Sequence, residues 1–132
     1  MHNEAIVSGM SPKKQDGPLE LVGNLYPEKP PIDDRGLMPL RYTGAGFLLI
    51  QRSVFERMKQ DKTIDEYRSD YSGRVEHDFW RPGVYKGRYL PEDFFFCQRA
   101  RDLGFKVWAD SRVRLQHIGN VSLPLQSQWR NP

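Results

Sequence analysis

The chain has 132 residues, of which 38% are hydrophobic and 12% aromatic, so it suits one compact domain rather than two and is not a disordered chain. No apolar run approaches the roughly 18 residues of a membrane span, and the N-terminus lacks the features of a signal peptide. We therefore expect a cytoplasmic protein with no membrane span.

The charge is modest and uneven. The net charge is +3, and the half from 67 to 132 carries 11 basic and 7 acidic residues. No Lys/Arg block is present, which argues against a nucleic-acid partner. A local positive field would instead suit a phosphorylated small molecule. The single Cys97 excludes an internal disulfide and a cysteine-based zinc cluster.

The first third of the chain is predicted to be a strand followed by a long loop. Residues 5–10 are typical of a short buried strand. Residues 11–36 contain five of the ten prolines, which predicts little regular structure beyond a short strand at 19–22. Loops of this length are usually functional or mobile.

A turn, a strand and a helix are predicted next. The small residues of 43–46 indicate a turn, and the apolar run 47–50 indicates a strand buried on both faces. Ser53 is expected to begin a helix, with Glu56 completing a capping box. The charged segment 59–66 would end that helix.

The second half is predicted to contain one more helix and two strands. Residues 67–88 indicate a loop with at most a short strand around Phe79. Pro91 is expected in the first turn of the helix, and Gly104 at its end. Strands are predicted at 105–109 and 113–117, the second with Val113, Leu115 and His117 on one face, and an irregular tail at 120–132.

Strands and helices alternate along the chain, which favours an α/β fold. We expect a single domain over 1–132, with its core in 5–119.

The acidic pair Glu92 and Asp93 is the first candidate for chemistry. It follows Pro91 at a predicted helix start, beside three phenylalanines. The helix end lowers a carboxylate pKa, whereas nearby apolar surface raises it. Such a carboxylate could accept a proton from a sugar hydroxyl. The alternative is that the pair only complements the helix dipole.

Two further candidates lie at the ends of predicted strands. His117 ends the last strand and could bind a divalent metal, although it could equally be a structural histidine. The Gly44-Ala45-Gly46 turn would let a ligand approach the backbone closely, or could simply be a tight turn. No phosphate-binding glycine motif is present.

A weaker metal candidate is the run Glu76-His77-Asp78, which offers oxygen and nitrogen ligands within an aromatic segment. Adjacent side chains on a strand point in different directions, so a joint site would require a turn.

Taken together, several segments resemble the C-terminal half of a GT-A glycosyltransferase of the family-2-like type found in bacteria and phages. The segments that carry the resemblance are Tyr42–Glu56, Gly87–Cys97, Leu103–Asp110 and Leu115–Gly119, preceded by Ile6–Met10 with Lys13 and Lys14.

This resemblance implies a reduced GT-A-like mixed sheet flanked by helices. It also implies that Asp93 is the general base on an acceptor hydroxyl, and that Glu92 binds or orients the acceptor. Thr43, Gly44 and Gly46 would contact the donor sugar and acceptor, and His117 would bind Mn²⁺ or Mg²⁺. The reaction would transfer a sugar from a nucleotide-diphosphate donor to a glycan or other hydroxyl, with inversion, in the host cytoplasm if the chain is phage-encoded.

The chain departs from this family in two respects. The nucleotide-binding N-terminal half is missing, and no D-x-D motif occurs. Three alternatives follow: a minimal enzyme, one piece of a longer or split glycosyltransferase, or a non-catalytic module that binds a nucleotide sugar or carbohydrate. A half-sheet would expose strand edges, so we expect a homodimer or a completing partner chain.

Overall fold

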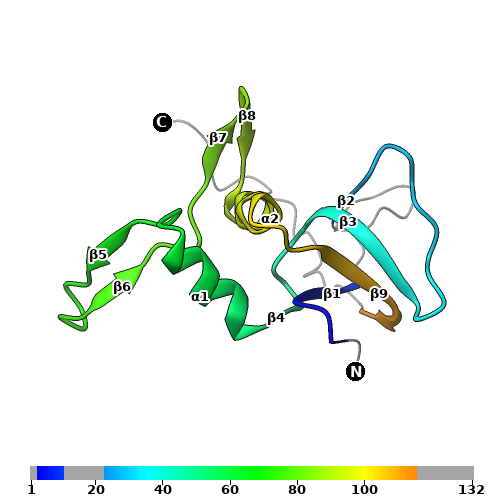
Figure 1. The fold of residues 1–132 in the computed structure, drawn as a ribbon, viewed down its shortest axis with the longest axis horizontal. Coiled ribbons are helices and arrows are strands. Elements are labelled where there is room, and N and C mark those ends of the chain that lie inside the picture. Colours follow the sequence, from blue (N-terminus) through cyan, green and yellow to red (C-terminus); the bar gives the residue numbers. More distant parts are fainter. Residues whose placement is uncertain (1–2, 11–22, 116–132) are drawn as a thin grey trace, which may run out of the picture.

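The computed structural model describes residues 3–10 and 23–115, which form a curled mixed sheet, two hairpins and two helices (Figure 1). The sheet has the order β2-β3-β9-β1-β4. Strands β1 and β9 are parallel, and the other neighbours are antiparallel. The strands are β1 (Ile6–Met10), β2 (Gly23–Leu25), β3 (Leu37–Thr43), β4 (Leu48–Ile50) and β9 (Val107–Arg114). The prediction that helices and strands combine in an α/β fold is confirmed.

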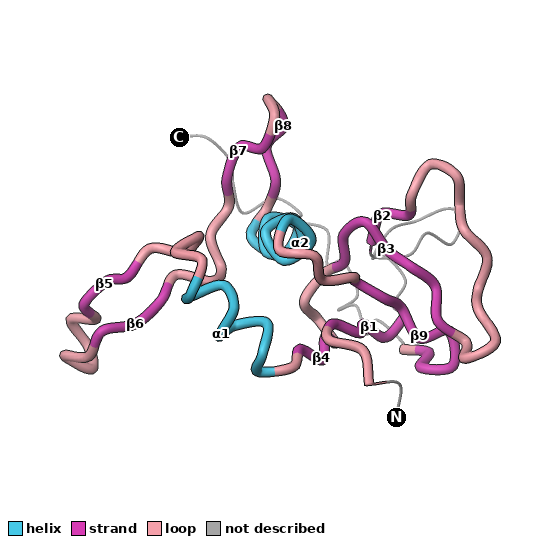
Figure 2. The backbone as a smooth tube through the Cα atoms, viewed as in Figure 1, coloured by secondary structure: helices cyan, strands magenta, loops and turns pink. Residues whose placement is uncertain are grey.

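The core lies between the sheet and helices α1 (Arg52–Gln60) and α2 (Glu92–Asp102) (Figure 2). Ile6, Tyr42 and Val107 of the sheet are buried there. The helices contribute Val54, Met58, Phe96, Cys97 and Ala100. Phe96 and Ala100 lie four positions apart and form the buried side of α2, and Gly104 follows the helix, as predicted, with a φ of 91° that favours glycine.

Two hairpins replace the loop predicted for 67–88. Strands β5 (Glu66–Arg68) and β6 (Val75–His77) pair antiparallel, as do β7 (Gly83–Tyr85) and β8 (Arg88–Leu90). The prediction of a strand at Phe79 was wrong, because β6 ends two residues earlier. Lys86 and Gly87 both have positive φ in the turn between β7 and β8, as a tight hairpin requires. β8 leads directly into α2.

Two further predictions about strands require correction. The run 47–50 is not buried on both faces, because β4 lies at the edge of the sheet, with Phe47 56% and Leu49 61% exposed. The segments 105–109 and 113–117 are not separate strands within the described residues, because β9 runs without interruption from Val107 to Arg114. Its predicted alternation does hold at Val113, which is more buried than Arg112 and Arg114.

The capping box predicted for α1 does not form. The helix begins at Arg52, with Gln51 at the N-cap and no side-chain cap. Glu56 instead forms ion pairs with Arg52 and Lys59 on the helix surface. Ser53 is an ordinary exposed residue of the first turn.

Some predictions lie outside the described residues, namely the strand at 19–22, His117 and the tail at 120–132. The part of loop 11–36 that is described contains β2. In the described parts of the chain, neither helix has the length and hydropathy needed to cross a membrane.

Candidate functional site

The turn that follows β3 is anchored at its first residue. Thr43 is buried, and its hydroxyl donates to Ser8 Oγ of β1 at 2.9 Å. Gly44, which follows Thr43, is also buried, whereas Ala45 and Gly46 are exposed. A Cβ at Gly46 would meet no atom within 4 Å, so this part of the turn is open to a ligand.

The acidic pair occupies the first turn of α2, as predicted. Pro91 is the N-cap residue in an extended conformation, and Glu92 and Asp93 follow it. Glu92 is exposed, whereas Asp93 is partly buried and accepts a hydrogen bond from the Phe94 N–H at 2.8 Å. The two carboxylates therefore have different environments.

The fold brings this turn and the helix start together, although they are far apart in the sequence. The Tyr42 ring stacks on Phe94, with ring centroids 5.2 Å apart. The Cys97 thiol lies 3.8 Å from the Thr43 carbonyl oxygen, to which it donates. A backbone group of Ala45 also interacts with the Asp93 carboxylate. The five predicted site residues of these two segments, Thr43, Gly44, Gly46, Glu92 and Asp93, are thus brought near one another.

The environment raises the pKa of Asp93 above its ordinary value of 3.8. Burial is the main cause, because it disfavours the charged form. A hydrogen bond from the Phe94 backbone opposes this effect, the charge of Glu92 adds to it, and the backbone of Ala45 again opposes it. A carboxylate with a raised pKa is a better proton acceptor than an ordinary aspartate.

Cys97 lies beside Asp93 on the same helix. Burial raises the pKa of its thiol to about 11, the Thr43 backbone lowers it, the charge of Asp93 raises it and the charge of Arg101 lowers it. Asp93, Cys97 and Arg101 follow one another at intervals of four positions, so they share one face of α2. Cys97 is therefore a packing residue between two charged groups.

The three residues of the weaker metal candidate have other partners. Glu76 accepts hydrogen bonds from the hydroxyls of Tyr67 at 2.9 Å and Ser72 at 2.8 Å. His77 Nε2 lies 3.3 Å from Glu66 Oε1. The Asp78 carbonyl oxygen accepts from the Arg99 guanidinium of α2 at 3.5 Å. These contacts support a structural role for the β5–β6 hairpin.

No group of three or more His, Cys, Asp or Glu side chains that could hold a metal ion occurs within 3–10 and 23–115. His117 lies outside them, and its role as a ligand stays a prediction.

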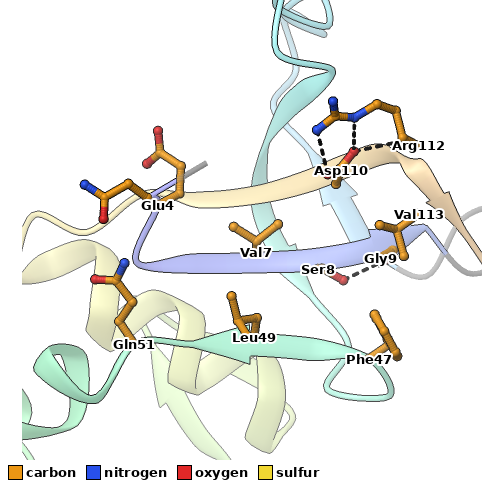
Figure 3. A pocket seen from close by; sticks show the side chains of 11 residues that line it. Glu4, Val7, Ser8, Gly9, Phe47, Leu49, Gln51, Asp110, Arg112 and Val113 are labelled. Atoms are coloured by element: carbon orange, nitrogen blue, oxygen red, sulfur yellow. Dashed lines mark hydrogen bonds and ion pairs between the residues drawn. The ribbon is translucent and has the colours of Figure 1, made fainter. Parts of the chain in front are cut away.

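A separate pocket of about 600 Å³ lies against β1, β4 and the end of β9 (Figure 3). Val7, Phe47, Leu49 and Val113 form its apolar part, as seen in Figure 3. Polar residues at the pocket include Glu4, Gln51, Asp110 and Arg112. None of the predicted site residues that the structure describes lines it, but Ser8 does, and Ser8 bonds to Thr43. Sequence reasoning missed this pocket because it treated β4 as buried.

No protein-family model matches the chain, and no curated protein or solved structure matches it either. The glycosyltransferase resemblance therefore depends on the sequence segments themselves.

Proposed function

We propose that the chain transfers a sugar from a nucleotide-diphosphate donor to an acceptor hydroxyl, with Asp93 as the general base. The observation that carries this proposal is the partly buried Asp93 carboxylate, with its raised pKa, next to the exposed Ala45-Gly46 backbone.

In the proposed reaction, an acceptor hydroxyl binds within hydrogen-bond reach of Asp93, and Glu92 holds a neighbouring hydroxyl. The carboxylate takes the hydroxyl proton as the acceptor oxygen attacks the anomeric carbon of the donor sugar. The bond from that carbon to the diphosphate oxygen breaks, and the nucleoside diphosphate leaves. Asp93 then releases the proton to water. Direct displacement from one side inverts the anomeric centre.

The exposed turn would contribute backbone contacts to the donor sugar or acceptor. Gly46 has no neighbouring atoms that a side chain would displace, so its small size leaves room for a ligand. Thr43 would act by holding the turn in place, because its hydroxyl is already bonded to Ser8.

The test is release of nucleoside diphosphate from a panel of nucleotide sugars, with and without acceptor sugars and Mn²⁺. Asp93→Asn keeps the side-chain shape and removes the base, so turnover should fall by about 100-fold or more. Asp70→Asn, in the exposed turn of the β5–β6 hairpin, is the matched control and should keep full turnover. Full turnover by Asp93→Asn would refute the assigned base. Donor binding without turnover would indicate a nucleotide-sugar-binding module.

A further inference from the structure

Three arginines from three different elements surround the Tyr42 ring. The guanidinium carbons of Arg41 in β3, Arg88 in β8 and Arg101 in α2 lie 5.3, 5.8 and 5.8 Å from the ring centroid. Any two of these guanidinium carbons are therefore separated by no more than twice 5.8 Å. Distant parts of the sequence thus place three positive charges around one side chain.

The aromatic ring that organises these arginines is fixed. Tyr42 is 1% exposed, stacks on Phe94 and donates a 2.7 Å hydrogen bond from its hydroxyl to Gln98 Oε1. Arg88 is exposed, and Arg41 and Arg101 are partly exposed. The ring is therefore held in place by the sheet and the helix, and the three arginines that lie near it are partly or fully exposed.

The three guanidinium groups lack carboxylate partners in the described part of the chain. The nearest polar contact of Arg101 is Gln98 Oε1 at 3.4 Å, and its guanidinium also lies over the Tyr26 ring. The Asp102 carboxylate accepts instead from Tyr85 and Gln98. Arginines elsewhere do form ion pairs, namely Arg35, Arg52, Arg57, Arg81 and Arg112.

Three like charges held near one another, with no carboxylate partner among residues 3–10 and 23–115, favour an anionic ligand. Guanidinium groups match the geometry of phosphate oxygens and bind them through paired hydrogen bonds. Three guanidinium groups that all lie within 5.8 Å of the Tyr42 ring centroid are close enough to one another for more than one of them to contact the same phosphate or diphosphate.

The cluster also lies on the same side of α2 as the proposed base. Asp93 and Arg101 flank Cys97 at intervals of four residues, about 12 Å apart along the helix axis. The Arg101 guanidinium contacts Gln98 Oε1 at 3.4 Å, so the side chain extends along the helix towards Asp93. An anion held by Arg101 would therefore lie on the Asp93 side of this residue.

We propose that Arg41, Arg88 and Arg101 form a binding site for a phosphate-bearing ligand, with Tyr42 as its support. Assigning that ligand to the leaving diphosphate of the donor rests on the proposed function, whereas the site itself rests on the arginines. In that assignment, the arginines stabilise the negative charge that develops on the diphosphate as its bond to the sugar breaks.

The experiment is calorimetric titration of the full chain with pyrophosphate at constant ionic strength, in a chelator so that no metal contributes. We expect saturable binding, weakened about tenfold in Arg88→Ala and abolished in Arg41→Ala/Arg88→Ala. Arg52→Ala removes an arginine whose side chain is 90% exposed on α1, and it should leave binding unchanged. Thermal unfolding of each variant verifies that it is folded, and Arg88→Lys should retain part of the affinity.

Absence of pyrophosphate binding by the folded wild-type chain would overturn the site, as would equal weakening by Arg52→Ala. A nucleoside diphosphate that binds more tightly than pyrophosphate would identify the donor as the source. A sugar monophosphate that binds more tightly would identify a phosphorylated acceptor. Pyrophosphate binding without sugar transfer would retain the site and refute the proposed function. Sugar transfer with an unchanged donor KM in Arg88→Ala would retain the proposed function and refute the assignment of this site to the donor diphosphate.

Discussion

The Tyr42 hydroxyl donates a 2.7 Å hydrogen bond to Gln98 Oε1, and both side chains are buried. This bond joins β3 to α2, the two elements that carry the turn and the acidic pair. We expect Tyr42→Phe to lower the free energy of unfolding by about 1 kcal/mol, because a buried acceptor loses its best donor. The ring stays, so pyrophosphate binding should persist.

Urea denaturation followed by circular dichroism measures this change. Tyr71→Phe is the matched control, since Tyr71 is fully exposed on the β5–β6 hairpin. Equal stability of the Tyr42→Phe chain and the wild type would show that the bond does not join the two elements.

Asp93→Asn should raise stability at neutral pH, whatever its effect on the proposed sugar transfer. Because burial raises the pKa of Asp93, the folded state binds more protons than the unfolded state between 3.8 and the raised value. Stability therefore falls as pH rises through that window, and the penalty persists above it. Asparagine carries no charge and escapes this penalty.

Thermal unfolding from pH 3 to pH 8 tests this expectation. The difference between Asp93→Asn and the wild type should be largest at neutral pH and should shrink below pH 3.8, the ordinary pKa. If Asp93→Asn were less stable than the wild type, and by the same amount at pH 7 and at pH 3, the carboxylate would not be desolvated.

Much of α2 could be predicted from the sequence, because its signals are local. Pro91 and the acidic pair indicate the start, Phe96 and Ala100 give the buried stripe, and Gly104 gives the end. By contrast, no strand was predicted at β3, where Pro39 and Arg41 interrupt the apolar pattern. Its position depends on pairing with β9 and β2, which are remote in the sequence.

The candidate site could likewise be predicted only in part from the sequence. Family resemblance points to Thr43 and Asp93 individually, but only the packing of α2 on β3 shows that their segments adjoin. The arginine cluster has no sequence signal, since Arg41, Arg88 and Arg101 have no common spacing and gather only around the buried Tyr42 ring.

Gly83→Ala should destabilise the chain. A Cβ at this position would lie 2.5 Å from the Phe95 ring, which forces β7 away from α2. We expect a loss of about 1–3 kcal/mol, as is usual for overpacking. The midpoint of urea unfolding measures it, and Gly46→Ala serves as control because its Cβ would meet nothing within 4 Å. Phe95→Leu should partly restore stability in the double variant. A neutral Gly83→Ala would contradict the close packing of this hairpin.

Leu49 is expected to take part in self-association or in contact with a completing chain. It is 61% exposed on the edge strand β4, beside the apolar pocket. Light scattering should show a dimer for the wild type, and Leu49→Lys should shift it towards a monomer. Val84→Lys, on the β7–β8 hairpin with Val84 70% exposed, should not have this effect. A wild-type chain that stays monomeric in light scattering, alone and with candidate partner chains, would contradict the expectation.

Thr43 is held from two directions, since its hydroxyl bonds to Ser8 and its carbonyl oxygen accepts from the Cys97 thiol. The exposed Ala45 and Gly46 therefore extend from a residue that is already fixed to both the sheet and the helix. A ligand that contacts this turn would lose little binding energy to ordering the backbone. Loosening Thr43, as in Thr43→Val, should then weaken affinity for such a ligand through an entropic cost, although the substituted side chain never touches it.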